Sequence, residues 1–107
     1  MSQFVIACYS PKPGKEQELL SLVQSHVPSL QRLDMVTPRP PLVLRNRDGV
    51  IVELFEWRSE DALEDAHLSP EVQAIWKQFD EVSDYKTLNN LPESKELFAQ
   101  FELVEMH

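Results

Sequence analysis

Cysteine and glycine are scarce in this sequence. The single cysteine, Cys8, cannot form a disulfide within the chain, and this fits a reducing compartment. The two glycines, Gly14 and Gly49, stand apart, so the chain has no glycine-rich loop of the kind that holds phosphate groups. We therefore expect a cytoplasmic protein without a disulfide framework or a phosphate-binding loop.

Long apolar runs and an excess of positive charge are also lacking. No run approaches the length of a membrane span, and no basic leader precedes the first apolar residues as in a signal peptide. The formal net charge is −8, from 18 acidic and 10 basic side chains. Because an acidic surface repels phosphate groups, we expect neither nucleic acid nor an anionic membrane as a partner.

The residues that are present suit one globular domain over residues 1–107, since 42% of them are apolar. Residues 4–9 (FVIACY) predict a strand, and residues 15–27 predict a helix. Pro28 is expected to end or kink this helix, with Leu30 and Leu33 continuing its apolar side on a further turn. Residues 42–57 (LVLRNRDGVIVELFEW) predict a hairpin that turns at Asp-Gly.

The second half of the chain adds a pair of helices. Ser59 predicts the cap of a short helix, and Ser69-Pro70-Glu71 predicts the start of another. The second helix has an apolar stripe made of Val72, Ile75, Trp76, Phe79 and Val82. We expect a strand over residues 85–88, a turn over residues 89–96 and a last strand over residues 98–104.

Apolar side chains on both faces of the strands indicate a sheet that needs a partner. The first strand offers Phe4 and Ile6 to one face, and Val5 and Tyr9 to the other. Helices that follow the first and third strands cover only one face of an antiparallel sheet. An open apolar face marks association, so we predict a homodimer with two-fold symmetry. The alternative is a monomer whose residues 89–107 fold over the second face.

This order of elements resembles the ferredoxin-like dimeric α+β barrel superfamily, and more closely its branch similar to antibiotic-biosynthesis monooxygenases (ABM-like). The hairpin that closes on VELFEW, the Ser-Glu-Asp helix start and the segment AHLSPEVQAIWKQF carry the resemblance, which extends over about residues 3–105. It implies an α+β fold with a ferredoxin-like antiparallel sheet, helices on one face, and a dimeric barrel. The activities that it implies include cofactor-independent monooxygenation, haem degradation, lactone isomerisation and aldoxime formation.

The residues that haem degradation requires in this superfamily are not matched here. Those members have an asparagine on the first strand, a tryptophan before the Ser-Pro break and a histidine on the helix after it. In this chain the first strand has no asparagine, Ala66 and His67 precede the break, and Trp76 stands where the histidine would fall. We therefore do not expect haem degradation.

Two titratable residues are candidates for catalysis. His67 shares a helix face with Leu63 and is placed to act as a general base, or else it caps the end of its helix. Glu53 has apolar neighbours on its strand face, so burial would raise its pKa and let it transfer protons. The alternative for Glu53 is an ion pair with Arg45. A cavity of about 300 Å³ or more that touches both candidates would favour catalysis.

Four aromatic residues, Tyr9, Trp57, Trp76 and Phe79, are candidates to line an apolar pocket for a small aromatic or hydrophobic ligand, although such residues also serve as plain core.

No metal and no cofactor are expected. Glu64 and His67 have a spacing that ligates metal only when a second such helix faces them, and His26 and His107 have no partners in the sequence. Cys8 lies inside a strand and is expected to be buried and inert.

The function that these residues indicate is a cofactor-independent monooxygenase or isomerase acting on a small aromatic or enolisable molecule. Glu53 or His67 would remove a proton, and the aromatic residues would hold the substrate. The resulting carbanion would react with oxygen without a metal. The alternative is a non-catalytic protein of the same fold that binds a small ligand or serves in assembly.

Overall fold

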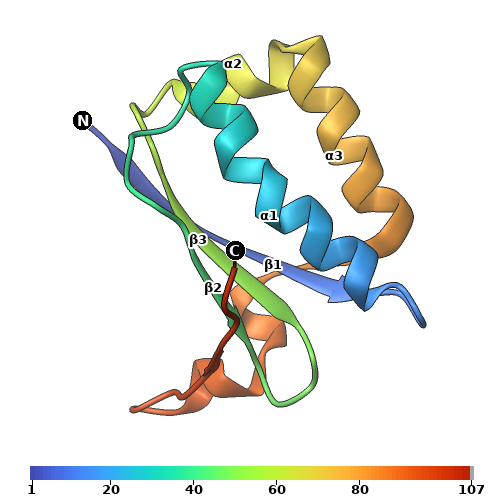
Figure 1. The fold of residues 1–107 in the computed structure, drawn as a ribbon. Helices are drawn as coiled ribbons and strands as arrows, with labels where there is room; N and C mark the ends of the chain where they lie inside the picture. The colour runs from blue at the N-terminus through green and yellow to red at the C-terminus, as the bar shows by residue number, and fades with distance from the viewer. Residues whose placement is uncertain (107) are drawn as a thin grey trace.

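The computed structural model describes residues 1–106, which form a five-stranded antiparallel sheet with three α-helices (Figure 1). The strands are β1 (Gln3–Pro11), β2 (Leu42–Arg45), β3 (Ile51–Trp57), β4 (Ser83–Lys86) and β5 (Glu102–Leu103). Their order across the sheet is β4-β1-β3-β2-β5. This architecture confirms the α+β class that the sequence predicts.

The helices lie together on one face of the sheet, and the C-terminal segment crosses the other face (Figure 1). The helices are α1 (Glu16–Arg32), α2 (Ala62–Leu68) and α3 (Pro70–Val82). Two short 3₁₀ helices, η1 (Leu88–Asn90) and η2 (Pro92–Lys95), follow β4. The element order agrees with the predicted order of strand, helix, hairpin, helix pair and strand.

Helix α1 continues past Pro28 to Arg32, so the further turn expected there is part of the same helix, and the alternative that the helix ends at Pro28 is wrong. Leu30 is fully buried in the core, and packing of this last turn outweighs the backbone hydrogen bond that proline cannot donate. The chain then reverses at Asp34, whose φ of 62° lies in the left-handed region that aspartate tolerates.

The two predicted caps after the hairpin have different outcomes. Ser69 caps α3 as predicted, because its Oγ accepts a hydrogen bond from the Val72 N–H at 3.3 Å. Ser59 does not cap α2: the N-cap position is Asp61, and no side chain there accepts a capping hydrogen bond. Ser59 instead accepts the Ala62 N–H through its backbone carbonyl, so it lies in the turn before the helix.

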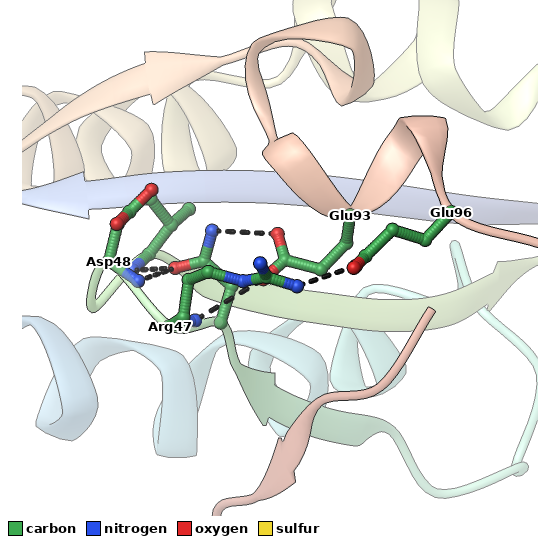
Figure 2. A network of polar contacts seen from close by, with 6 residues as sticks. Arg47, Asp48, Glu93 and Glu96 are labelled. Atoms are coloured by element: carbon green, nitrogen blue, oxygen red, sulfur yellow. Dashed lines mark hydrogen bonds and ion pairs between the residues drawn. The ribbon is translucent and has the colours of Figure 1, made fainter. Parts of the chain in front are cut away.

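The predicted hairpin is present, and its turn holds part of the C-terminal segment (Figure 2). Gly49 takes a φ of 85°, and the Asn46 side-chain oxygen accepts the N–H groups of Asp48 and Val50. Asn46 and Arg47 donate to Glu93, which is 1% exposed, and Arg47 also bonds Glu96. These contacts join η2 to the hairpin.

The second sheet face is covered only in part. Leu91 packs on Cys8 and Val52 and is 2% exposed, so the alternative of a C-terminal segment folded over this face is realised at one end. At the other end Phe4 is 63% exposed and Ile6 is 46% exposed.

The last two strands differ from their predicted extents. Strand β4 begins at Ser83 and pairs with residues 8–11 of β1, whereas the sequence places a strand over residues 85–88. Strand β5 has 2 residues, and the prediction of a strand over residues 98–104 is wrong in length. Leu97 and Phe98, within the predicted strand or just before it, are 89% and 83% exposed, whereas Phe101 packs on the second face of the sheet.

Candidate functional site

A cavity of about 630 Å³ lies between β1, β4 and the helix pair. Strand β4 pairs with residues 8–11 only, so no strand of the described chain covers residues 3–7 of β1 at that edge, and the cavity opens there. Seven aromatic side chains line it: Phe4, Tyr9, Phe55, Trp57, Trp76, Phe79 and Tyr85. The volume is that of a typical small-molecule site.

A chain of hydrogen bonds runs through the core beside this cavity. The Tyr9 hydroxyl donates to Glu53 Oε1 at 2.8 Å, and His26 Nδ1 lies 2.9 Å from the same oxygen. The Trp76 Nε1–H donates to His26 Nε2 at 3.1 Å. The four residues come from β1, β3, α1 and α3, so both layers of the fold contribute to the site.

The geometry fixes where the protons lie. The indole N–H of Trp76 is only a donor, so His26 Nε2 must be the acceptor and the proton of the neutral imidazole sits on Nδ1. His26 therefore donates to Glu53, which is fully buried, and its partners in the part of the chain that the structure describes are Tyr9 and His26. No Lys or Arg pairs with this carboxylate within residues 1–106.

Tyr9 is held in its protonated form. Burial, followed by the charge of Glu53 and the hydrogen bond to it, raises the pKa of Tyr9 well above its ordinary value. The phenol therefore remains a donor at neutral pH, and it separates the Glu53 carboxylate from the cavity.

Of the two predicted catalytic residues, one lines the cavity and the other does not. His67 lines it and is exposed, with its ring centroid 5.1 Å from that of Trp76. In the described residues its ring makes no hydrogen bond of the kind expected for a helix cap, although its backbone carbonyl accepts from Gln73. Glu53 lies behind Tyr9 and His26, which form the wall between it and the cavity.

The alternative ion pair of Glu53 with Arg45 is wrong. In the register of the hairpin Arg45 lies opposite Ile51, whereas Glu53 lies opposite Val43. Arg45 instead pairs with Glu16 at 2.6 Å and Glu102 at 2.8 Å. Because Arg45 lies two residues along β2 from the position opposite Glu53, the hydrogen-bond partners of Glu53 are His26 and Tyr9.

The sequence reasoning missed His26, which it described as a residue without partners. The structure gives it Glu53 and Trp76, from 27 and 50 positions away in the chain. One signal was present: His26 follows Leu19 by seven residues and Val23 by three, so it lies on the buried stripe of α1. A histidine on such a stripe needs a polar partner from another element.

The predicted ligand-binding residues Tyr9, Trp57, Trp76 and Phe79 all line the cavity, and they also belong to the core. Tyr9 stacks on Phe79 with centroids 4.9 Å apart. Their packing fixes the wall of the cavity before any ligand enters.

Other kinds of site find little support in residues 1–106. No group of three or more His, Cys, Asp or Glu side chains there is arranged to hold a metal ion. None of the described helices has the length and apolar character needed to cross a membrane. Burial raises the pKa of the Cys8 thiol, which lowers its reactivity.

No family model, no curated protein and no solved structure matches this chain significantly.

Proposed function

We propose that this protein is an enzyme that removes a proton from a small aromatic or enolisable molecule bound in the cavity. The observation that carries the proposal is the buried His26, which lines an aromatic cavity, bonds a carboxylate through one ring nitrogen and accepts the Trp76 N–H with the other. A histidine oriented in this way by a carboxylate is the usual arrangement of a general base.

The proposed proton transfer follows from the two ring nitrogens of His26. A substrate that displaces the Trp76 N–H gives its proton to His26 Nε2, and the imidazolium is stabilised by the Glu53 carboxylate. The released Trp76 N–H is then free to donate to the oxygen of the enolate. Returning the proton to a different carbon completes an isomerisation. In the monooxygenase variant the carbanion and dioxygen give a hydroperoxide, which loses water to leave a carbonyl group, so the substrate itself supplies the electrons.

His67 serves as the second titratable group in this proposal. It lines the cavity and is exposed, so it can exchange protons with solvent while His26 remains buried. Glu53, which the sequence suggested as a base, orients His26 and stabilises its charge, because it does not reach the cavity.

The proposal places the protein in the ABM-like branch of the ferredoxin-like dimeric barrels. The strand order β4-β1-β3-β2, with the helices on one face, supports this placement. The exposed apolar residues of the second sheet face support a homodimer; they are Phe4, Ile6 and Leu42, together with Leu97 and Phe98 of the C-terminal segment.

Hydrogen–deuterium exchange at the acidic carbon of an enolisable ketone tests the proposal. In D₂O, 2-tetralone should exchange its acidic hydrogens faster with the protein than without it, as followed by ¹H NMR. His26→Asn keeps a donor to Glu53 but removes the nitrogen that accepts from Trp76 and is proposed as the base, so exchange should fall by roughly a hundredfold or more. His67→Asn, at the other histidine of the cavity, is the matched control and should cost less.

A non-catalytic ligand-binding protein is the second candidate. It is favoured by the absence of unsatisfied buried side-chain polar atoms in the described structure, which leaves His26 Nε2 already bonded to Trp76. Binding of 2-tetralone without protein-dependent exchange would support this candidate and contradict the enzyme.

A further inference from the structure

The charged side chains that line the cavity are all acidic. Glu60 and Asp80 line it, and no Lys or Arg of the described residues does. The Glu53 carboxylate lies directly behind the wall formed by Tyr9 and His26. Glu53 is fully buried, whereas Glu60 and Asp80 are exposed and are screened by salt; together the three charges give the apolar cavity a negative potential.

Most of the hydrogen-bond donors of the cavity wall are already committed. The Trp76 N–H donates to His26, the Tyr9 hydroxyl donates to Glu53, and the Tyr85 hydroxyl donates to the Trp76 carbonyl at 3.1 Å. Even the Gln3 amide donates to Glu60, at 3.4 Å. In the lining that the structure describes, an anionic ligand would meet no Lys or Arg, and the side-chain donors left to it are those of Ser59 and the exposed His67.

The two carboxylates lie at opposite ends of the cavity. Glu60 contacts Gln3 at the start of β1, whereas Asp80 lies beside Tyr85, which is opposite Tyr9 in the register. Six residues of strand separate these ends, which is roughly 20 Å. Aromatic rings occupy the wall between them, and their faces attract cations.

We propose that the ligand of this cavity is a small aromatic molecule that carries a protonated amine and no anionic group. The aromatic part lies among Trp57, Trp76 and Tyr85, and the ammonium lies next to Glu60 or Asp80. This inference narrows the class of ligand expected in the cavity. Its choice of cavity rests on the proposed function.

Three ligands of one shape test the inference: 2-aminotetralin is cationic, 2-tetralol is neutral and tetralin-2-carboxylate is anionic. Calorimetric titration of the full chain at low salt should show the amine binding at least about tenfold more tightly than the carboxylate, with the alcohol between them. The difference should shrink as salt is added.

Two double variants test which carboxylates cause the preference for the amine. The double variant Glu60→Gln with Asp80→Asn should abolish most of the preference for the amine and leave 2-tetralol binding unchanged. Glu64→Gln with Glu81→Gln, on α2 and α3, changes the net charge equally, but neither residue lines this cavity, so the preference should persist.

Equal or tighter binding of the carboxylate would overturn the inference, as would a failure of all three ligands to bind at millimolar concentration. An equal loss of preference in both double variants would also contradict it. The exchange of 2-tetralone decides the proposed function separately, since it needs no charged ligand.

Discussion

Glu53 is a fully buried carboxylate, and within the described residues its two donors are an imidazole and a phenol. A buried charge is tolerated when its hydrogen bonds are made, and it becomes costly when one of them is removed. The same two donors form the cavity wall. At the scale of single residues, therefore, the groups that stabilise the core are also the groups that we expect to act on a ligand.

Tyr9→Phe measures this dependence. The substitution removes one donor from the buried carboxylate, so the free energy of unfolding should fall by about 1–3 kcal/mol. Urea denaturation at neutral pH provides the measurement. Tyr85→Phe removes a hydroxyl from a ring that is 51% exposed and should cost less than about 1 kcal/mol. Equal changes in the two variants would show that the Tyr9–Glu53 bond has no special role.

At the scale of helices and strands, local sequence signals predicted the features that depend only on neighbouring residues. The Ser69-Pro70 start of α3 and the Asp48-Gly49 turn are examples, because capping and positive φ depend on neighbouring residues. The apolar pattern also predicts a further turn at Leu30, but whether that turn joins α1 across Pro28 depends on burial of Leu30 by other elements.

The candidate site was predictable to a similar degree. Aromatic periodicity placed Trp76 and Phe79 on the inner face of α3, and both line the cavity. The pairing of His26 with Glu53 depends on how α1 lies over the sheet, and the sequence pattern gives that packing only as a buried position.

The contacts of Glu93 hold η2 on the hairpin and should make this element sensitive to acid (Figure 2). Burial alone would raise the pKa of Glu93, but hydrogen bonds from backbone N–H groups, Arg47 and Asn46 outweigh it and hold the pKa below its ordinary value of 4.5. A lowered pKa contributes stability that is present above the ordinary value and lost as the pH falls through the folded-state value.

Amide hydrogen exchange should show this element opening on its own. In Arg47→Ala, protection factors of residues 88–96 should fall by roughly tenfold or more, while those of α1 and α3 stay unchanged. Lowering the pH below 4.5 should reduce the same protection factors in the unmodified chain. A uniform loss of protection over the whole chain would contradict a separately held C-terminal segment.

At the scale of the whole molecule, the partly covered second face of the sheet is the basis for the proposed homodimer. Leu91 covers one end of the second face, and the apolar end around Phe4 and Ile6 is exposed. We propose that a second copy of the chain covers this exposed end. Phe4 also lines the cavity, so a partner docked on this face would lie beside the cavity mouth.

Ile6→Glu tests the assembly. Sedimentation should show a dimer of the unmodified chain at micromolar concentration and a folded monomer of the variant, because a charge cannot be buried between two apolar faces. Leu68→Glu, at a side chain that is 77% exposed on α2 on the helix side of the sheet, should remain dimeric. A monomeric unmodified chain would refute the homodimer.

The most direct test of the account is an experimental structure of the protein with 2-tetralone bound. We expect the ring among the cavity aromatics, its acidic carbon roughly 3–3.5 Å from His26 Nε2, and the Trp76 N–H turned from the imidazole to the ketone oxygen. A ligand bound elsewhere, or a bound ligand that leaves the Trp76–His26 hydrogen bond intact, would contradict His26 as the base.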